Sequence, residues 1–217
     1  MIKIIATLLT FFAFNVSHAK VNVGIILGFT GPIETLTPGM SAGAELAFNE
    51  AADSGKLLNG QGINIIKVDS TCVDSAAATS AAESLISQGV TAIMGADCSG
   101  VTGAVLSNVA VPNGVPMISP SATSPGLTTA PDNGLFFRTA PSDARGGEVL
   151  ADITSSRGIS SVAITYVNTD YGVGLADVYE AAAEARGIEV TVKQLMKLTK
   201  QIIVLKLVFF HLQVAKP

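Results

Sequence analysis

Short runs of apolar residues alternate along the chain with longer segments in which apolar residues recur at helical spacing. The apolar and β-branched runs predict strands at 21–27, 63–68, 91–94, 115–118, 135–138, 161–167 and 188–192. Between them, apolar stripes next to capping residues predict helices at 37–54, 75–88, 99–109, 143–156 and 171–185. We expect Thr37 to cap the first helix, with Pro38 at its first position.

Predicted strands and helices follow one another at a spacing of about 30 residues, joined by short loops. This order predicts right-handed βαβ units and an α/β fold with a doubly wound parallel sheet. Ligands of such folds bind beyond the carboxyl ends of the strands. The loops expected there are rich in glycine and hydroxyl groups and read GFTGPIE, DSTCVD, GADCSGVT, ISPSATSPG and VNTDYGVG.

The N-terminus has the composition of a secretory signal peptide. Lys3 precedes an apolar stretch from Ile4 to Phe14, and Ser17 and Ala19 place small side chains at the positions that a signal peptidase inspects. A buried N-terminal helix is the alternative. We predict a signal peptide over residues 1–19, and a mature chain that begins at Lys20 outside the cytoplasm.

An extracytoplasmic location bears on the two cysteines, Cys72 and Cys98. Each follows a predicted strand by a similar short offset, so both are expected at the carboxyl edge of the sheet. A bridge between them would stabilise the fold by about 3.5 kcal/mol in the chain-entropy model. Two free thiols are the alternative. A metal site is not expected, because two cysteines without a nearby histidine do not complete one.

Residue usage argues against several classes of protein. Residues 20–193 contain no histidine, and the chain has no G-x-S-x-G elbow, P-loop or G-x-G-x-x-G fingerprint. Familiar hydrolase and nucleotide-dependent mechanisms therefore lose support, although carboxylate or lysine chemistry does not. The net charge is −4, but six of the 13 basic residues are Lys3 or lie from Lys193 onward. The body thus carries about −10, which disfavours nucleic acid and anionic membranes as partners.

Several loop residues suit a small carboxylate bound without chemistry. Ser99 is expected at a helix start, where it can offer both its hydroxyl and its N–H group. Ser121 and Thr123 supply hydroxyls around Ala122, which lets the backbone approach a ligand closely. The ring of Tyr171 could cover an apolar or zwitterionic ligand. Each residue has an ordinary alternative role as a helix cap or turn residue.

Taken together, the loops resemble those of the leucine/isoleucine/valine-binding protein family, the type I periplasmic solute receptors of ABC importers. The resemblance covers Val21 to Val192. It rests on these segments in this order: VNVGIILGFTGPI, DSTC, GADCSG, MISPSATSPGLT, FFRTAPSD and NTDYGVGLAD.

The resemblance implies a type I periplasmic binding fold with flavodoxin-like strand order and no enzymatic activity. It implies a Cys72–Cys98 disulfide and a hinge crossing near 138–142. Ligand contacts are implied for six residues: Ser99, Gly100, Ser121, Ala122, Thr123 and Tyr171. It further implies a periplasmic monomer without metal or cofactor, which closes on an amino acid and delivers it to the membrane permease of the importer.

Four segments follow from this interpretation. They are a signal peptide (1–19), an N-terminal ligand-binding lobe (20–139), a partial second lobe (140–195) and an aberrant tail (196–217). From Val190 onward the chain has no acidic residue, and Ala215 is its only alanine or glycine. We therefore expect a frameshifted or mispredicted gene end there, and a second lobe that has only begun.

Three further interpretations stay open. Within the same fold, the ligand could instead be a urea-like amide or an aromatic acid. The domain could also be the sensory module of a signalling protein. An extracytoplasmic α/β hydrolase is a third possibility, against which the absence of histidine from the body argues.

Overall fold

The computed structural model describes residues 20–56 and 60–196. The predicted signal peptide, and the predicted aberrant tail apart from Met196, lie outside the described residues. The described helices and strands are β1 (Val21–Leu27), α1 (Thr37–Asp53), β2 (Ile63–Asp69), α2 (Ser75–Ser87), β3 (Ala92–Gly95), α3 (Ser99–Val105), which continues as the π-helix η2 (Leu106–Ala110), β4 (Met117–Ser119), the 3-10 helix η3 (Pro125–Thr128), β5 (Phe136–Arg138), α4 (Asp143–Ser156), β6 (Ser161–Tyr166), α5 (Asp170–Glu184) and β7 (Glu189–Leu195). None of these helices combines the length and apolar character that crossing a membrane requires.

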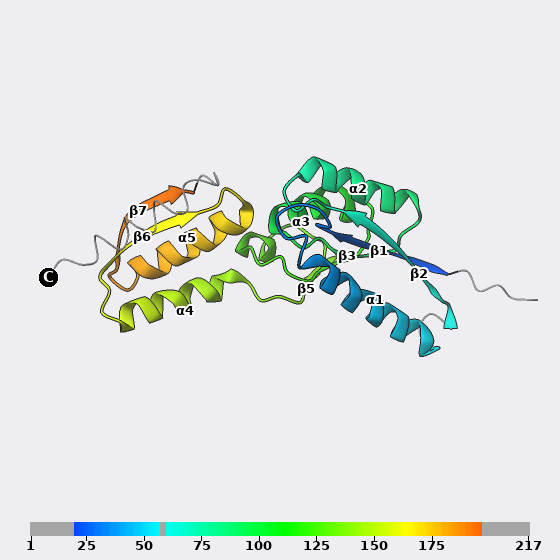
Figure 1. Cartoon of the computed structure of the whole chain (residues 1–217), viewed down its shortest axis with the longest axis horizontal. Helices are drawn as coiled ribbons and strands as arrows, with labels where there is room; N and C mark the ends of the chain where they lie inside the picture. Colours follow the sequence, from blue (N-terminus) through cyan, green and yellow to red (C-terminus); the bar gives the residue numbers. More distant parts are fainter. Residues whose placement is uncertain (1–19, 57–59, 197–217) are drawn as a thin grey trace, which may run out of the picture.

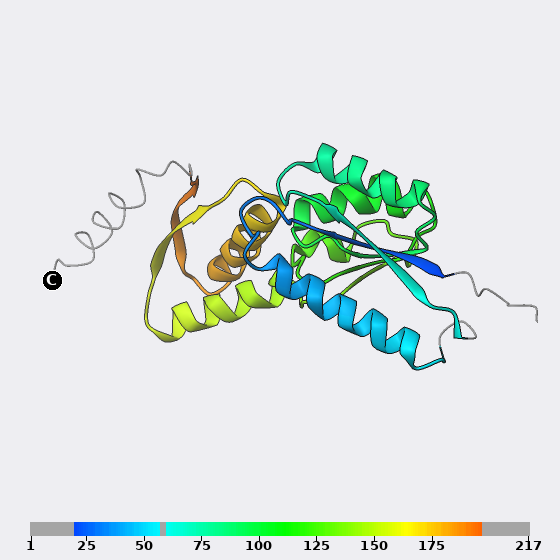
Figure 2. The ribbon, with the colours of Figure 1, turned by 45° about the vertical axis from the view of Figure 1, so that its right-hand side comes forward.

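Strands β1 to β5 form a parallel sheet in the order β2-β1-β3-β4-β5. This is the flavodoxin-like order, with its topological switch point between β1 and β3. Helix α1 covers one face of the sheet, and α2 and α3 cover the other (Figures 1 and 2). We call residues 20–138 the first unit.

Burial on both faces explains the sequence of β1. Ile25, Ile26 and Leu27 are fully buried, as expected for the central strand of a covered parallel sheet. The core beside it includes Leu85 of α2 and Met117 of β4.

Residues 139–142 cross to a second group of elements, residues 143–196, which we call the second unit. It consists of α4, α5 and the parallel pair β6–β7. The unit lies at the end of the first unit that the carboxyl ends of β1 and β3 face, and the start of α5 points toward α3 (Figures 1 and 2). The predicted α/β fold class, with a parallel sheet covered by helices on both faces, is therefore confirmed.

Three local predictions need correction. Thr37 is not the N-cap of α1; Leu36 holds that position without a side-chain cap. The Thr37 hydroxyl instead lies within hydrogen-bonding distance of the carbonyls of Gly28 and Glu34, because the residue is fully buried under the end of β1. Helix α5 begins at Asp170 rather than Tyr171, since the Thr169 hydroxyl caps it by accepting from Gly172 N–H. Strand β7 continues to Leu195, beyond the predicted end at 192.

Candidate functional site

The loops that follow β1, β2, β3 and β4 meet at the carboxyl edge of the five-stranded sheet, and a disulfide joins two of them. Cys72 and Cys98 are bonded, with their Cα atoms 5.2 Å apart. The predicted bridge is therefore present. It fixes the loop after β2 against the start of α3, on either side of the end of β1.

Ser99 occupies the first position of α3 and is buried, with 3% of its surface exposed. Its Oγ accepts a hydrogen bond of 3.1 Å from Ser124 N–H, which belongs to the loop after β4. Thr102 N–H is the first to bond back, to the carbonyl of Cys98. The preceding N–H groups, including that of Gly100, point out of the helix start and can serve an anion.

The segment 119–124 folds around the hydroxyl of Ser119. Ser119 Oγ donates to Ala96 O and accepts from Ala122 N–H at 3.0 Å. Ser121 Oγ donates to Asp97 O at 2.9 Å. Ala122 is fully buried and Thr123 is partly exposed. The backbone N–H of Ala122 and the hydroxyl hydrogen of Ser121 are therefore both used in hydrogen bonds within the protein. The hydroxyl of Thr123 belongs to the same loop.

Arg138 holds this loop from the other side. Its Nη1 donates to Ser124 O at 2.9 Å and to Ala122 O at 3.3 Å, and its Nη2 donates to the Thr128 hydroxyl. The crossing to the second unit begins directly after Arg138. At its far end Asp143 N–H donates to Thr123 O at 3.0 Å, so the loop also contacts the start of α4. The buried Oδ2 of Asp143 has no hydrogen-bond partner among the described residues.

Helix α5 brings the second unit against these loops. A Cβ atom built on Gly100 would lie 3.7 Å from the carboxylate of Asp170, so the first residue of α5 adjoins the start of α3. A Cβ atom built on Gly174 would lie 3.2 Å from Ser124 Oγ and 3.0 Å from Pro125 Cδ. The absence of a side chain at Gly174 thus permits the two units to meet closely, whereas a Cβ atom at Gly100 would make an ordinary van der Waals contact.

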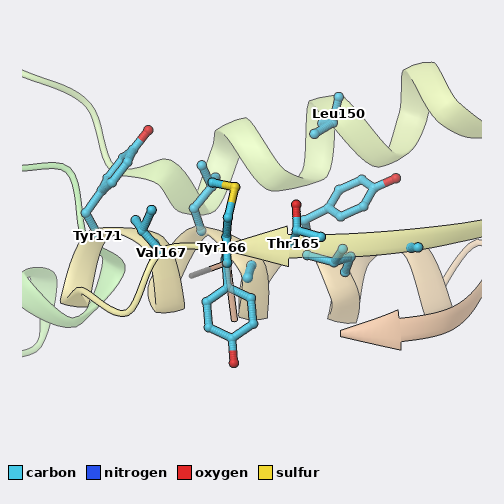
Figure 3. A pocket seen from close by; sticks show the side chains of 12 residues that line it. Leu150, Thr165, Tyr166, Val167 and Tyr171 are labelled. Carbon is cyan, nitrogen blue, oxygen red and sulfur yellow. The ribbon is translucent and has the colours of Figure 1, made fainter. Parts of the chain in front are cut away.

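Tyr171 stands in the first turn of α5 and is 47% exposed. It borders a largely apolar pocket of about 460 Å³ in the second unit, with residues of α4, β6 and α5. Figure 3 shows its ring projecting from the start of α5, in the direction opposite to that of Tyr166. The structure therefore places Tyr171 in the first turn of α5, directly after Asp170, with its ring at the edge of this pocket.

Asp69, at the end of β2, belongs to the same edge of the sheet but serves a neighbouring loop. Burial raises the pKa of Asp69, but hydrogen bonds from the Thr30 hydroxyl and from the N–H groups of Thr71 and Thr30 outweigh that effect and lower the pKa overall. Its ionised form thus fixes the loop after β1 at neutral pH. Within residues 20–56 and 60–196, His, Cys, Asp and Glu side chains form no cluster able to hold a metal ion.

Sequence reasoning missed four residues of this region. Ser119 and Ser124 belong to the hydroxyl-rich segment after β4, and its composition could have indicated them. Asp170 directly precedes Tyr171, and that position could have indicated it. Asp97 is the fourth; the signal was an acidic residue between the end of a buried strand and a cysteine.

The fold and the loops define a class of protein: an α/β protein that collects hydroxyls and backbone N–H groups at a switch point, suited to bind a small molecule. Residues 20–201 match the family model described as periplasmic binding protein. The chain belongs to the periplasmic binding protein family, a family of solute-binding proteins rather than enzymes, whose location is the periplasm.

Two comparisons make the relationship more specific. The chain is 33% identical over 187 residues to the Leu/Ile/Val-binding protein BraC3 of Rhizobium johnstonii, a match that covers 84% of this chain and 49% of the relative. It superposes with a TM-score of 0.73 and 26% identity on the branched-chain amino acid transporter substrate binding protein LivJ of Streptococcus pneumoniae in complex with isoleucine, covering 87% of this chain and 53% of the other.

A third comparison concerns the fold alone. An ABC transporter solute binding protein of R. palustris in complex with 4-hydroxybenzoate gives a TM-score of 0.73 at 19% identity, covering 89% of this chain and 51% of the other. The chain spans about half the length of the relatives it matches.

Proposed function

We propose that this chain captures a small amino acid of the branched-chain type between its two units, as part of the substrate-binding component of an ABC importer. The proposal divides the mature chain into a lobe of residues 20–139 and a partial lobe of residues 140–195. The observation that supports it best is that Ser99 can still donate a hydrogen bond and Ser121 can still accept one, which matches the two charged groups of a zwitterion.

Ser99 suits the ligand carboxylate. Its Oγ already accepts from Ser124 N–H, so its own hydroxyl hydrogen can be donated. The N–H groups at the start of α3, including that of Gly100, add further donors directed at an anion. Hydrogen bonds of this kind to an ionised carboxylate are about twice as strong as neutral ones.

Ser121 suits the ligand ammonium group. A backbone carbonyl can only accept, so the Ser121 hydroxyl hydrogen is committed to Asp97 O. The remaining lone pairs of Ser121 Oγ can then accept from an ammonium group. The carbonyl of Ala122 and the hydroxyl of Thr123 lie on the same loop and supply further acceptors, and Tyr171 covers the ligand from the second unit.

The mechanism implied is closure without chemistry. A ligand that contacts both α3 and the start of α5 binds the closed arrangement better than an open one, and so shifts the population toward closure. The closed form is then recognised by the membrane permease. We further propose secretion to the periplasm through the signal peptide and a monomeric receptor.

An aromatic acid is the second candidate, because the donor set at Ser99 fits any carboxylate and a solved protein of this fold holds 4-hydroxybenzoate. The acceptor at Ser121 favours the amino acid. Removing the amine from the ligand therefore separates the two candidates.

The test compares leucine with 4-methylpentanoate, which is leucine without its amine, by calorimetry and thermal shift on the 217-residue chain. We expect leucine to bind at least about tenfold more tightly, the equivalent of one charge-assisted hydrogen bond. Ser99→Ala should weaken both ligands, whereas Ser121→Ala should weaken only leucine. Stabilisation by 4-hydroxybenzoate and not by leucine, isoleucine or valine would favour the second candidate. No response to any of these ligands would contradict both.

A further inference from the structure

One buried carboxylate lies beneath the proposed ligand site and takes no direct part in it. Asp97 follows β3 at the switch point of the sheet and is 2% exposed. Among the described residues it forms no ion pair; its contacts are hydrogen bonds to neutral groups. Burial of a charge is costly unless such bonds satisfy it, so we asked which groups satisfy the Asp97 carboxylate and what they hold in place.

The contacts of Asp97 reach the ends of all four neighbouring strands. Its Oδ2 accepts from Gly28 N–H at 2.7 Å, at the end of β1. Its Oδ1 accepts from the Ser70 hydroxyl at 3.2 Å, after β2, and from Cys98 N–H at 3.0 Å, before α3. Its backbone carbonyl accepts from the Ser121 hydroxyl, after β4. One residue thus joins four loops that are far apart in the sequence.

The bonds on either side of Asp97 lead directly to the proposed ligand contacts. Cys98 N–H precedes Ser99 by one residue, and the Ser121 hydroxyl takes its orientation from Asp97 O. Ser99 Oγ in turn holds Ser124 N–H. A displacement of Asp97 would therefore alter both the carboxylate side and the ammonium side of the site.

We propose that Asp97 is a positioning residue, which sets the geometry of Ser99 and Ser121 by holding the ends of β1 and β2 against the start of α3. The proposal rests on the proposed function for its effect on affinity, but its structural content concerns bonds within the protein. An amide in place of the carboxylate keeps the volume, yet directs N–H toward groups that also donate. It therefore breaks at least one of the three side-chain bonds.

The experiment compares Asp97→Asn with Asp69→Asn by residue-resolved amide hydrogen exchange without ligand, and by leucine affinity. Asp69 is a matched control, since it also accepts backbone N–H bonds at a strand end, but from residues of the loops after β1 and β2 such as Thr30 and Thr71. For Asp97→Asn we expect exchange at least about tenfold faster at Gly28, Cys98 and Ser124, and leucine affinity at least about tenfold weaker. For Asp69→Asn we expect faster exchange at Thr30 and Thr71 and an affinity within about twofold of the original.

Unchanged exchange at Ser124 in Asp97→Asn would overturn the proposal, because that amide reports on the link between the two ligand loops. An equal loss of affinity in both variants would also overturn it, by showing a general effect of loosened strand ends. Should the unaltered chain bind no leucine, the proposed function fails, but the exchange pattern still decides the role of Asp97. If Asp97→Asn does not fold, Ser70→Ala, which removes one donor, should give the same pattern at a smaller size, and the absence of that pattern would count against the proposal.

Discussion

The two units are built from the same kinds of element but bury very different amounts of apolar surface. In the first unit Ile25, Ile26 and Leu27 are fully enclosed between helices on both faces of the sheet. In the second unit the core cluster consists of three alanines and Ile188, and Leu150 of α4 is 48% exposed. Because burial of large apolar side chains supplies most of the folding energy, the first unit carries most of the stability.

Among the described residues, ion pairs are more numerous in the second unit than in the first. Lys193 of β7 forms ion pairs with Asp177 and Glu180 of α5, and the hydrogen bonds that its ammonium group donates to these two carboxylates raise the pKa of Lys193. Arg186 and Asp152 form a further pair between α5 and α4. Pairs that solvent reaches contribute little. The first unit is therefore the better packed of the two, and the second unit relies more on its small core and on surface ion pairs.

The largest loss of stability should follow from removing the Cys72–Cys98 disulfide, which lies wholly in the first unit. Replacing both cysteines by serine should lower the free energy of unfolding by about 3.5 kcal/mol, because the unfolded chain regains the freedom of the closed loop. Urea unfolding followed by circular dichroism measures this. Treatment of the unaltered protein with a reductant is the control and should give a comparable loss; a loss below about 1 kcal/mol in both would show that the edge of the sheet is held by other contacts.

Truncating one leucine in each unit tests the difference in burial directly. Leu85→Ala should cost about 3 kcal/mol, because it leaves a cavity among fully buried side chains. Leu150→Ala should cost less than about 1 kcal/mol, since the side chain is half exposed. Both values come from denaturant unfolding of otherwise identical chains. Equal costs would mean that the second unit is as well packed as the first.

Two adjacent glycines of α4 test how closely this helix packs against α5 in the second unit. A Cβ atom on Gly147 would lie 2.7 Å from Val178 Cγ2 and 3.0 Å from Tyr179 N, so Gly147→Ala should cost about 1–3 kcal/mol by forcing α4 away from α5. Nothing lies within 4 Å of such an atom on Gly146. Gly146→Ala should therefore stabilise the helix by about 0.5–1 kcal/mol. Hydrogen exchange of the α4 amides measures both, and an equal response would contradict the close helix contact.

The parts of the fold that could be predicted from sequence are those governed by local patterns. β1 was predicted with its observed bounds because a strand buried on both faces is a continuous apolar run. Thr37 was assigned wrongly because a threonine before a proline has the pattern of a cap, whereas the contact with Gly28 that decides its role is made only after folding.

The candidate site likewise contains features that local sequence predicts and features that depend on the assembled fold. Loop positions such as Ser99 and Ser121 could be located from strand ends and hydroxyl content. The hydrogen bonds of Asp97, on which its proposed role depends, could not be predicted, since its partners come from residues 28, 70, 98 and 121, and only the assembled sheet brings these together. The close approach of Gly100 to Asp170 likewise depends on how the two units meet, which no single segment encodes.

The position of the disulfide has a consequence for how the chain matures. Cys72 follows β2 and Cys98 follows β3, and in the sheet these two strands flank β1. In the native fold the sulfur atoms therefore meet across the end of the N-terminal strand, and the bridge joins the loops on its two sides. Oxidation would then hold this threaded arrangement more firmly than the reduced chain does.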